Sequence, residues 1–157
     1  GPQKMGAIME ILEGVNWGKL DFLIVDLPPG TGDETLTITQ NMGMGTKAIV
    51  VTTPQDVALL DSRRSVKFSG LVNMELIGII ENMSGFICPE CGKEMNIFKK
   101  GGAKKMAEEL NATYLGSIPM DKSIVDAGDD GKPYVQVESE SSNRLNKIID
   151  QILDKVK

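Results

Sequence analysis

The cysteine pair in the segment CPECG carries the first candidate chemistry. Cys88 and Cys91 are separated by two residues and are the only cysteines of the chain. At this spacing both thiolates can face one metal, and Gly92 permits the tight turn that follows. Zinc and iron-sulfur clusters normally take four ligands, so one such pair is half of a site, and the chain has no histidine to complete it. A second copy of the chain would supply the other half, because a two-fold interface repeats every ligand.

The spacing of this pair leaves other uses open. CPECG also resembles one knuckle of a zinc ribbon, and four thiolates across a dimer would accept zinc as readily as a cluster. A thioredoxin-like redox pair is disfavoured because the motif follows a predicted strand and a loop instead of opening a helix. Two free, reduced thiols are the simplest alternative.

A second candidate site is the segment VDLPPGTGDETL, at residues 25–36. Asp26 follows four apolar residues, and a buried carboxylate there would need a partner such as a magnesium ion with its bound waters. The two prolines stiffen the loop, and its two glycines leave backbone amides open to an anion. Asp33 is a natural N-cap for a following helix. A rigid strand-to-helix turn with a capping aspartate explains the same residues equally well.

Composition limits the remaining function classes. A chain of 157 residues, 41% hydrophobic and 25% charged, suits one globular domain with a core. A net charge of -5 without a basic cluster argues against a nucleic-acid binder. No apolar run is long enough to span a membrane and no signal peptide is visible, so we expect a cytoplasmic protein with reduced thiols. The absence of histidine excludes Ser-His and Cys-His catalytic pairs.

The strands and helices that position these residues are predicted from short apolar runs that alternate with helical patterns. Four runs predict buried strands, at residues 22–25, 48–52, 76–80 and 114–118. Apolar residues at helical spacing predict helices at residues 7–14, 34–42, 56–70, 102–110 and from about 142 onward. This alternation predicts an α/β fold, with a parallel sheet joined by right-handed crossovers and covered by helices on both faces.

Polar residues follow each predicted strand, where ligands of such sheets bind. Asp26, Thr52, the pair Glu81-Asn82 and the segment 119–121 are expected to form one rim at the carboxyl ends of the strands. Thr53 and Gln55 are better explained as ordinary polar loop residues.

The segments DFLIVDLPPGTGDETLT, VVTTPQDVALLD, IIENMSGFICPECG and LGSIPMD together resemble the Mrp/ApbC family of iron-sulfur cluster carrier ATPases, in the MinD-like group of deviant P-loop proteins. The resemblance runs over nearly the whole chain. It implies one α/β domain over residues 1–157 with P-loop NTPase-like layers and a CxxC metal-binding loop at residues 84–100. It also implies a carrier that transfers a 4Fe-4S cluster to apo iron-sulfur proteins, coupled to ATP binding and hydrolysis in the full-length protein.

The resemblance assigns a role to each candidate residue. Asp26 matches the Walker B acid, which holds Mg²⁺ through water. The implied nucleotide-binding residues belong to the switch loop, the adenine contact and the loop over the base: Gly30, Thr31, Gly32, Asn82, Pro119 and Asp121. Cys88 and Cys91 match the cysteines that bridge a labile 4Fe-4S cluster between the protomers of a homodimer, where zinc could take its place. No nucleic acid or membrane partner is implied.

The family's other phosphate-binding motif does not occur in this sequence. Members carry a K-G-G-V-G-K-[ST] loop after their first strand, and residues 101–104, GGAK, lack the required spacing and are better explained as a connection before a helix. The absent strand would lie between the strands that end at Asp26 and Thr52, so the sheet is expected to be incomplete. We therefore expect a C-terminal portion of a larger protein, which alone does not hydrolyse ATP at a useful rate.

Two alternative functions remain at this point. The first is a MinD/ParA-like positioning ATPase, and the second is a zinc-binding structural dimer module. Some MinD-like proteins bind membranes through a terminal amphipathic helix, but here Asp150 and Asp154 on the polar face would repel anionic lipid, so packing against the sheet is favoured. The acids of residues 126–132 lack EF-hand spacing and predict a turn-rich loop.

Overall fold

The computed structural model describes residues 2–42, 45–88, 90–97 and 99–156. Pro89, within the cysteine motif, lies outside the described residues. In chain order the elements are α1 (Pro2–Gly14), α2 (Asp33–Asn41), β1 (Lys47–Thr52), α3 (Asp56–Leu71), β2 (Glu75–Glu81), β3 (Phe86–Ile87), β4 (Glu94–Met95), α4 (Gly102–Glu109), β5 (Tyr114–Ser117), α5 (Lys122–Asp129), the 3-10 helix η1 (Tyr134–Gln136) and α6 (Glu140–Val156).

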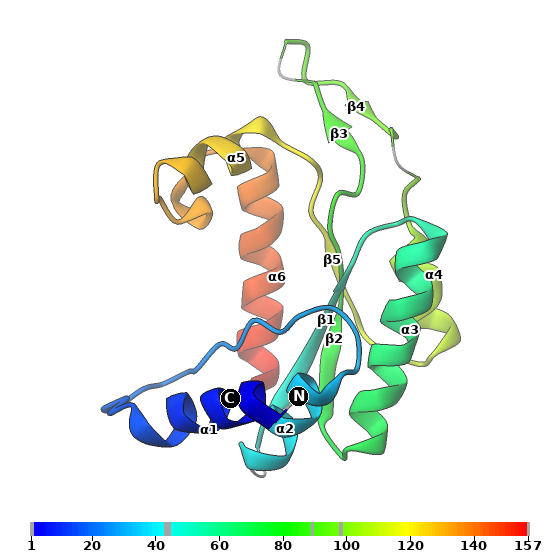
Figure 1. Cartoon of the computed structure of the whole chain (residues 1–157). Helices are drawn as coiled ribbons and strands as arrows, with labels where there is room; N and C mark the ends of the chain where they lie inside the picture. Colours follow the sequence, from blue (N-terminus) through cyan, green and yellow to red (C-terminus); the bar gives the residue numbers. More distant parts are fainter. Residues whose placement is uncertain (1, 43–44, 89, 98, 157) are drawn as a thin grey trace.

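A parallel sheet in the order β1-β2-β5 forms the centre of the molecule (Figure 1). Its pairing runs from Lys47 opposite Glu75 to Thr52 opposite Glu81, and β5 pairs with the second half of β2. The middle strand β2 is buried from Ile77 to Glu81, as its continuous apolar run predicts. The predicted α/β class and the three strands at residues 48–52, 76–80 and 114–118 are confirmed.

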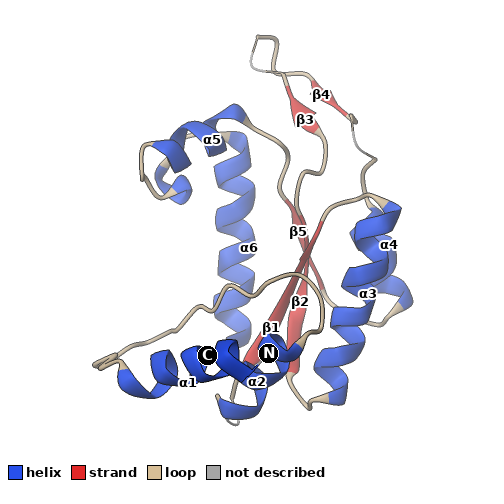
Figure 2. Ribbon diagram, viewed as in Figure 1, coloured by secondary structure: helices blue, strands red, loops and turns tan. Residues whose placement is uncertain are grey.

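Helices cover both faces of this sheet, as expected (Figure 2). On one face α3 and α4 enclose a core cluster that includes Leu59, Ile79 and Met106. On the other face α6 packs on β5 and β2 through Ile148, which is 2% exposed. The prediction that the C-terminal helix packs against the sheet is therefore confirmed. Among the described residues, no helix combines the length and the apolar character needed to cross a membrane.

A small antiparallel hairpin, β3–β4, leaves the sheet after β2. Phe86 pairs with Met95 and Ile87 pairs with Glu94. In Figure 1 the hairpin projects beyond the end of the sheet at which β1 and β2 finish, and the chain returns from it into α4. The cysteine motif occupies the loop of this hairpin.

The predicted strand at residues 22–25 is wrong. These residues form an irregular segment in which Phe22 is 53% exposed and Ile24 is 86% exposed. An apolar run becomes a buried strand only when neighbouring strands pair with its amides, and the described sheet consists of β1, β2 and β5 alone. Three strand ends, not four, therefore form the rim, and Asp26 is exposed instead of following a buried strand.

Two local predictions are also corrected. Gly32, not Asp33, is the N-cap of α2, and no side-chain hydrogen bond caps this helix. Residues 126–129 belong to α5 and not to a loop. Here Asp121 caps the helix by accepting a hydrogen bond from the Ser123 amide, and this cap offsets the poor helix propensity of the glycine and aspartates that follow.

Candidate functional site

The cysteine pair lies in the loop that joins β3 to β4. The Cys88 amide donates to the Lys93 carbonyl at 3.0 Å, and the Gly92 amide donates to the Cys88 carbonyl at 2.8 Å. Gly92 has a φ of +68°, which confirms the predicted need for glycine in this turn. Cys88 is half-buried and Cys91 is exposed, and both are free thiols. The loop therefore presents a thiol pair at the end of a projecting hairpin.

The two cysteines are close enough to influence each other. The Cys91 amide hydrogen-bonds to the Cys88 sulfur and, together with the Glu90 amide and the Cys91 thiol, lowers the pKa of Cys88 below its ordinary value. Such donors favour the thiolate, which is the form that binds metals. Within the part of the chain that the structure describes, no cluster of three or more Cys, Asp, Glu or His side chains could hold a metal, so the pair remains half of a site.

The stem of the hairpin is attached to the segment that follows β5. The Ser84 amide donates to the Ile118 carbonyl at 3.0 Å, and the Met120 amide donates to the Gly85 carbonyl at 2.8 Å. Phe86 also forms a parallel bridge with Met120. The candidate base-binding segment 119–121 is thus hydrogen-bonded alongside the backbone that leads to Cys88.

Asn82 lies at the same rim, immediately after β2. Its amide donates to the Thr52 carbonyl at 2.7 Å, and its side-chain Oδ1 accepts from the Met83 amide at 2.9 Å. The structure therefore brings Asn82, Pro119 and the base of the cysteine hairpin to one edge of the sheet. The parallel pairing of β1, β2 and β5 produces this arrangement, because the carboxyl ends of parallel strands meet at one edge.

Asp121 is held in place by the helix that it caps. Its Oδ1 accepts from the Ser123 amide at 2.9 Å and from the Ser123 hydroxyl at 2.7 Å, and its Oδ2 accepts from the Tyr134 hydroxyl at 3.4 Å. Burial acts to raise the pKa of Asp121, but these hydrogen bonds outweigh burial and the pKa is lowered. The carboxylate stays ionised and fixes the segment that borders the hairpin.

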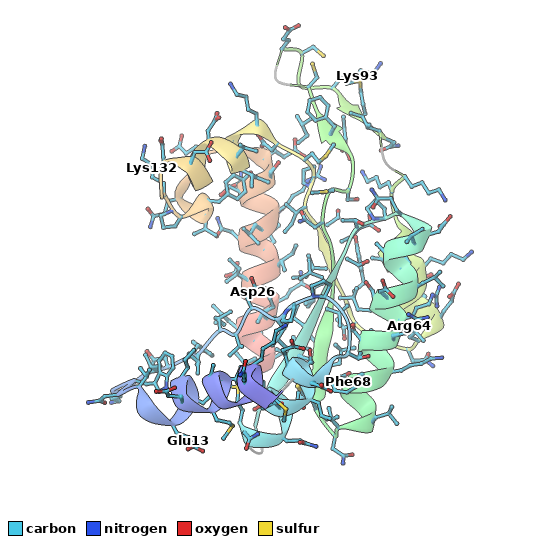
Figure 3. All side chains as sticks on the ribbon, viewed as in Figure 1. Glu13, Asp26, Arg64, Phe68, Lys93 and Lys132 are labelled. Atoms are coloured by element: carbon cyan, nitrogen blue, oxygen red, sulfur yellow. The ribbon has the colours of Figure 1, made fainter. Side chains whose placement is uncertain are left out.

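The predicted phosphate loop lies apart from this edge. Gly30 has a φ of +98° and accepts from the Thr35 hydroxyl at 3.5 Å, so the loop folds back onto α2. A Lys4–Glu34 ion pair at 3.0 Å ties α2 to α1. Figure 3 shows Asp26 on the long connection between α1 and α2. Because residues 22–25 do not join the sheet, the structure does not bring Asp26 or the glycines 30 and 32 to the rim that holds Asn82.

Sequence reasoning placed Glu81 at the rim without giving it a role, and it missed Glu94 of β4. Glu81 is completely buried at the end of β2. Glu94 forms ion pairs with Lys100 and, at 3.3 Å, with Arg144 of α6, and the pKa of Glu94 is lowered first by the hydrogen bond from Lys100. An acid directly after a buried apolar run was the signal for Asp26, and the same signal was present at Glu81.

Comparisons with known proteins show the family of the chain. The model of the ParA family, described as NUBPL iron-transfer P-loop NTPase, matches residues 1–157. An iron-sulfur cluster carrier protein of Methanocaldococcus jannaschii is 47% identical over 99% of this chain and 54% of its own length. The cytosolic Fe-S cluster assembly factor CFD1 of Candida albicans is 41% identical over 99% of this chain and 58% of its own. The chain thus spans about half the length of these curated relatives.

Solved structures show the same fold. A nucleotide-binding protein in complex with ADP from Archaeoglobus fulgidus has a TM-score of 0.73 and 32% identity, over 89% of this chain and 56% of that chain. The cell division ATPase MinD of Pyrococcus furiosus has a TM-score of 0.66 over 99% of this chain and 59% of its own, and at 19% identity it supports the fold alone. The match over the full length of the family model and the identity to its named relatives show that the chain belongs to the ParA family of NUBPL-type iron-transfer P-loop NTPases.

Proposed function

We propose that this chain acts in iron-sulfur cluster assembly as a carrier, with Cys88 and Cys91 holding the cluster as cargo. The observation that carries the proposal is the thiol pair at the end of a hairpin that projects from the sheet, with Cys91 exposed. Relatives named as iron-sulfur cluster carriers and as a cytosolic Fe-S cluster assembly factor support it. Apo iron-sulfur proteins are the proposed recipients.

The ligand count favours a cluster shared by two copies of the chain. A 4Fe-4S cluster takes four thiolates, and one chain offers two. In a homodimer joined through its hairpins, Cys88 and Cys91 of both protomers would complete the set around one 4Fe-4S cluster. A cluster in that position lies at the surface of each protomer, where a recipient protein can reach it.

ATP and Mg²⁺ are proposed as the nucleotide partners of the full-length protein. Asp26 would hold Mg²⁺ through water, and the loop with Gly30, Thr31 and Gly32 would contact the phosphates. Asn82 and the segment 119–121 would bind the base. This arrangement requires residues 22–32 to reach the rim at Asn82. In the described chain residues 22–25 lie outside the sheet, and the carbonyls of Gly30 and Gly32 accept hydrogen bonds from α2. We therefore expect no useful ATP hydrolysis by this chain alone.

Zinc is the competing occupant of the thiol site. A dimeric set of four thiolates suits tetrahedral zinc, and a cysteine pair in a hairpin turn is the geometry of a zinc knuckle. A positioning ATPase is less well supported, because soft thiolate ligands have no use in that activity and α6 buries Ile148 against the sheet. An experiment must therefore distinguish a chain that binds an iron-sulfur cluster from one that binds zinc.

Anaerobic incubation of the intact chain with ferrous iron and sulfide tests the proposal. We expect a broad visible absorption band that survives desalting and is absent when the thiols are alkylated beforehand. The physical reason is that thiolate-to-iron charge transfer needs sulfur bound to iron. A folded protein that takes up zinc but develops no thiol-dependent band would overturn the carrier function and favour the structural zinc module.

A further inference from the structure

Glu81 is the one carboxylate among the described residues that is completely buried, with 0% of the residue exposed. It ends β2, the central strand, next to Asn82 and five residues before Phe86, where the hairpin begins to pair. A carboxylate removed from water is tolerated only when hydrogen-bond donors surround it. The hydrogen-bond donors around Glu81 therefore indicate its structural role.

Three hydrogen bonds reach the Glu81 carboxylate from the two ends of the hairpin. Ahead of β3, the Ser84 hydroxyl donates to Oε1 at 2.5 Å. After β4, the Gly101 amide donates to the same Oε1 at 2.8 Å, and the Ala103 amide donates to Oε2 at 2.7 Å. A single side chain therefore joins the outgoing and the returning stems of the segment that carries the cysteines.

On the returning side Glu81 replaces a missing helix cap. Gly101 is the N-cap of α4, has a φ of +83° and has no side chain with which to cap the helix. The Glu81 carboxylate takes that role by accepting from the N-cap amide of Gly101 and from the Ala103 amide of the first turn, where the helix dipole favours a negative charge. The first turn is also tightly packed, since a Cβ atom at Gly102 would lie 2.8 Å from Leu59 Cδ1 and 2.9 Å from the Pro54 carbonyl oxygen. The return of the hairpin is thereby fixed to the sheet.

We propose that Glu81 is a positioning residue for the thiol pair: it clamps both stems of the hairpin to the end of β2 and so sets the geometry and the retention of the cluster. This inference rests on the proposed function. Glu94 also contacts residues outside the hairpin loop, but its side chain is 29% exposed and its partners, Lys100 and Arg144, are partly exposed as well. Residues that hydrogen-bond to the ligands of a metal site, or to the backbone that carries them, orient those ligands. Substituting such a residue commonly weakens metal retention by about 10–100-fold.

Glu81→Gln is the sharpest variant, because glutamine keeps the size of the side chain and loses one acceptor oxygen. An NH2 group cannot accept from a backbone amide, so at least one of the three hydrogen bonds to Glu81 is lost. Glu75→Gln is the matched control: it makes the same substitution at the other end of β2, at a side chain that is 63% exposed. Ser84→Ala is a milder second variant that removes only the outgoing contact and leaves both helix amides bound to the carboxylate.

Two rates are measured on folded protein. In the apo chain, we expect amide hydrogen exchange in residues 84–101 to rise about tenfold in Glu81→Gln while exchange in β1 is unchanged. In the reconstituted chain, we expect loss of iron to a chelator to accelerate about 10–100-fold in Glu81→Gln, about fivefold in Ser84→Ala, and less than about twofold in Glu75→Gln. Local exchange without a change in β1 distinguishes positioning of the hairpin from general loss of stability.

The outcomes separate this inference from the proposed function. Iron loss from both Glu81→Gln and Ser84→Ala at the rate of Glu75→Gln, from a wild-type chain that does hold a cluster, would refute the role of Glu81. The same holds if exchange rises equally in the hairpin and in β1. If the wild-type chain forms no thiol-dependent cluster, the carrier function fails, and exchange in the apo chain still decides whether Glu81 clamps the hairpin.

Discussion

Replacing Cys88 with serine is expected to reduce the iron and sulfide retained after anaerobic reconstitution to the level of the alkylated wild-type chain. Serine keeps the size of the side chain, but its hydroxyl does not ionise near neutral pH and is a poor ligand for iron in a cluster. In a symmetric dimer the substitution removes two of four ligands at once. Hydrogen bonds from the Cys91 and Glu90 amides lower the pKa of Cys88, so Cys88→Ser removes a thiolate that its surroundings favour.

Lys93→Ser is the matched control for that experiment. Lys93 belongs to the same loop, and Figure 3 shows it on the projecting hairpin. Its side chain is exposed, and the hydrogen bond that its backbone accepts from the Cys88 amide does not depend on the side chain. Iron content within the error of wild type is expected for Lys93→Ser. Retention of the full visible band by Cys88→Ser would exclude the thiol pair as the cluster site.

Gly78→Ala is expected to destabilise the fold by about 2–3 kcal/mol. Gly78 lies in the central strand, where the β1–β2 pairing shifts register and skips Ile77. A Cβ atom at this position would lie 2.7 Å from both Leu115 Cγ and the Thr113 carbonyl oxygen. That carbonyl also accepts the Ile79 amide at 2.8 Å, so it cannot move away without breaking a hydrogen bond of the sheet.

Gly70→Ala is the control for the stability measurement. Gly70 lies near the end of α3 and has no atom within 4 Å of an added Cβ, so alanine fits there. Alanine favours helix and reduces the freedom of the unfolded chain, which predicts a gain of about 0.4–1 kcal/mol. Urea unfolding of both variants gives the two free energies. Equal stability of Gly78→Ala and wild type would mean that β2 and β5 do not approach as closely as described.

The sequence was most informative for apolar segments that have a packing or pairing partner within the described chain. The runs at residues 48–52, 76–80 and 114–118 form the sheet because each finds a parallel neighbour, and the helix at residues 102–110 follows from its apolar spacing. The run at residues 22–25 has the same composition but no neighbouring strand in the described chain. Apolar content predicts that a segment can be a strand, whereas pairing decides whether it becomes one.

Local features of the candidate site were also predictable from the sequence, whereas its long-range contacts were not. The turn at Gly92 was predictable because the tight turn that follows the two cysteines needs a residue that tolerates positive φ. The role of Glu81 was not predictable, because it depends on amides at residues 101 and 103 that only the return of the hairpin brings close. Contacts between segments distant in sequence can be identified only once the fold is known. For Glu81, the one signal in the sequence was an acidic residue at the end of a predicted buried strand.

Mass spectrometry of the reconstituted protein under native, anaerobic conditions tests the central claim most directly, because it counts chains and cargo in one particle. If two copies share one cluster through Cys88 and Cys91, the cluster-bearing species has the mass of two chains plus four iron and four sulfide. The same species is expected to vanish in Cys88→Ser and to persist in Lys93→Ser. A cluster bound to a single chain, or retained by dimers that lack Cys88, would contradict the account.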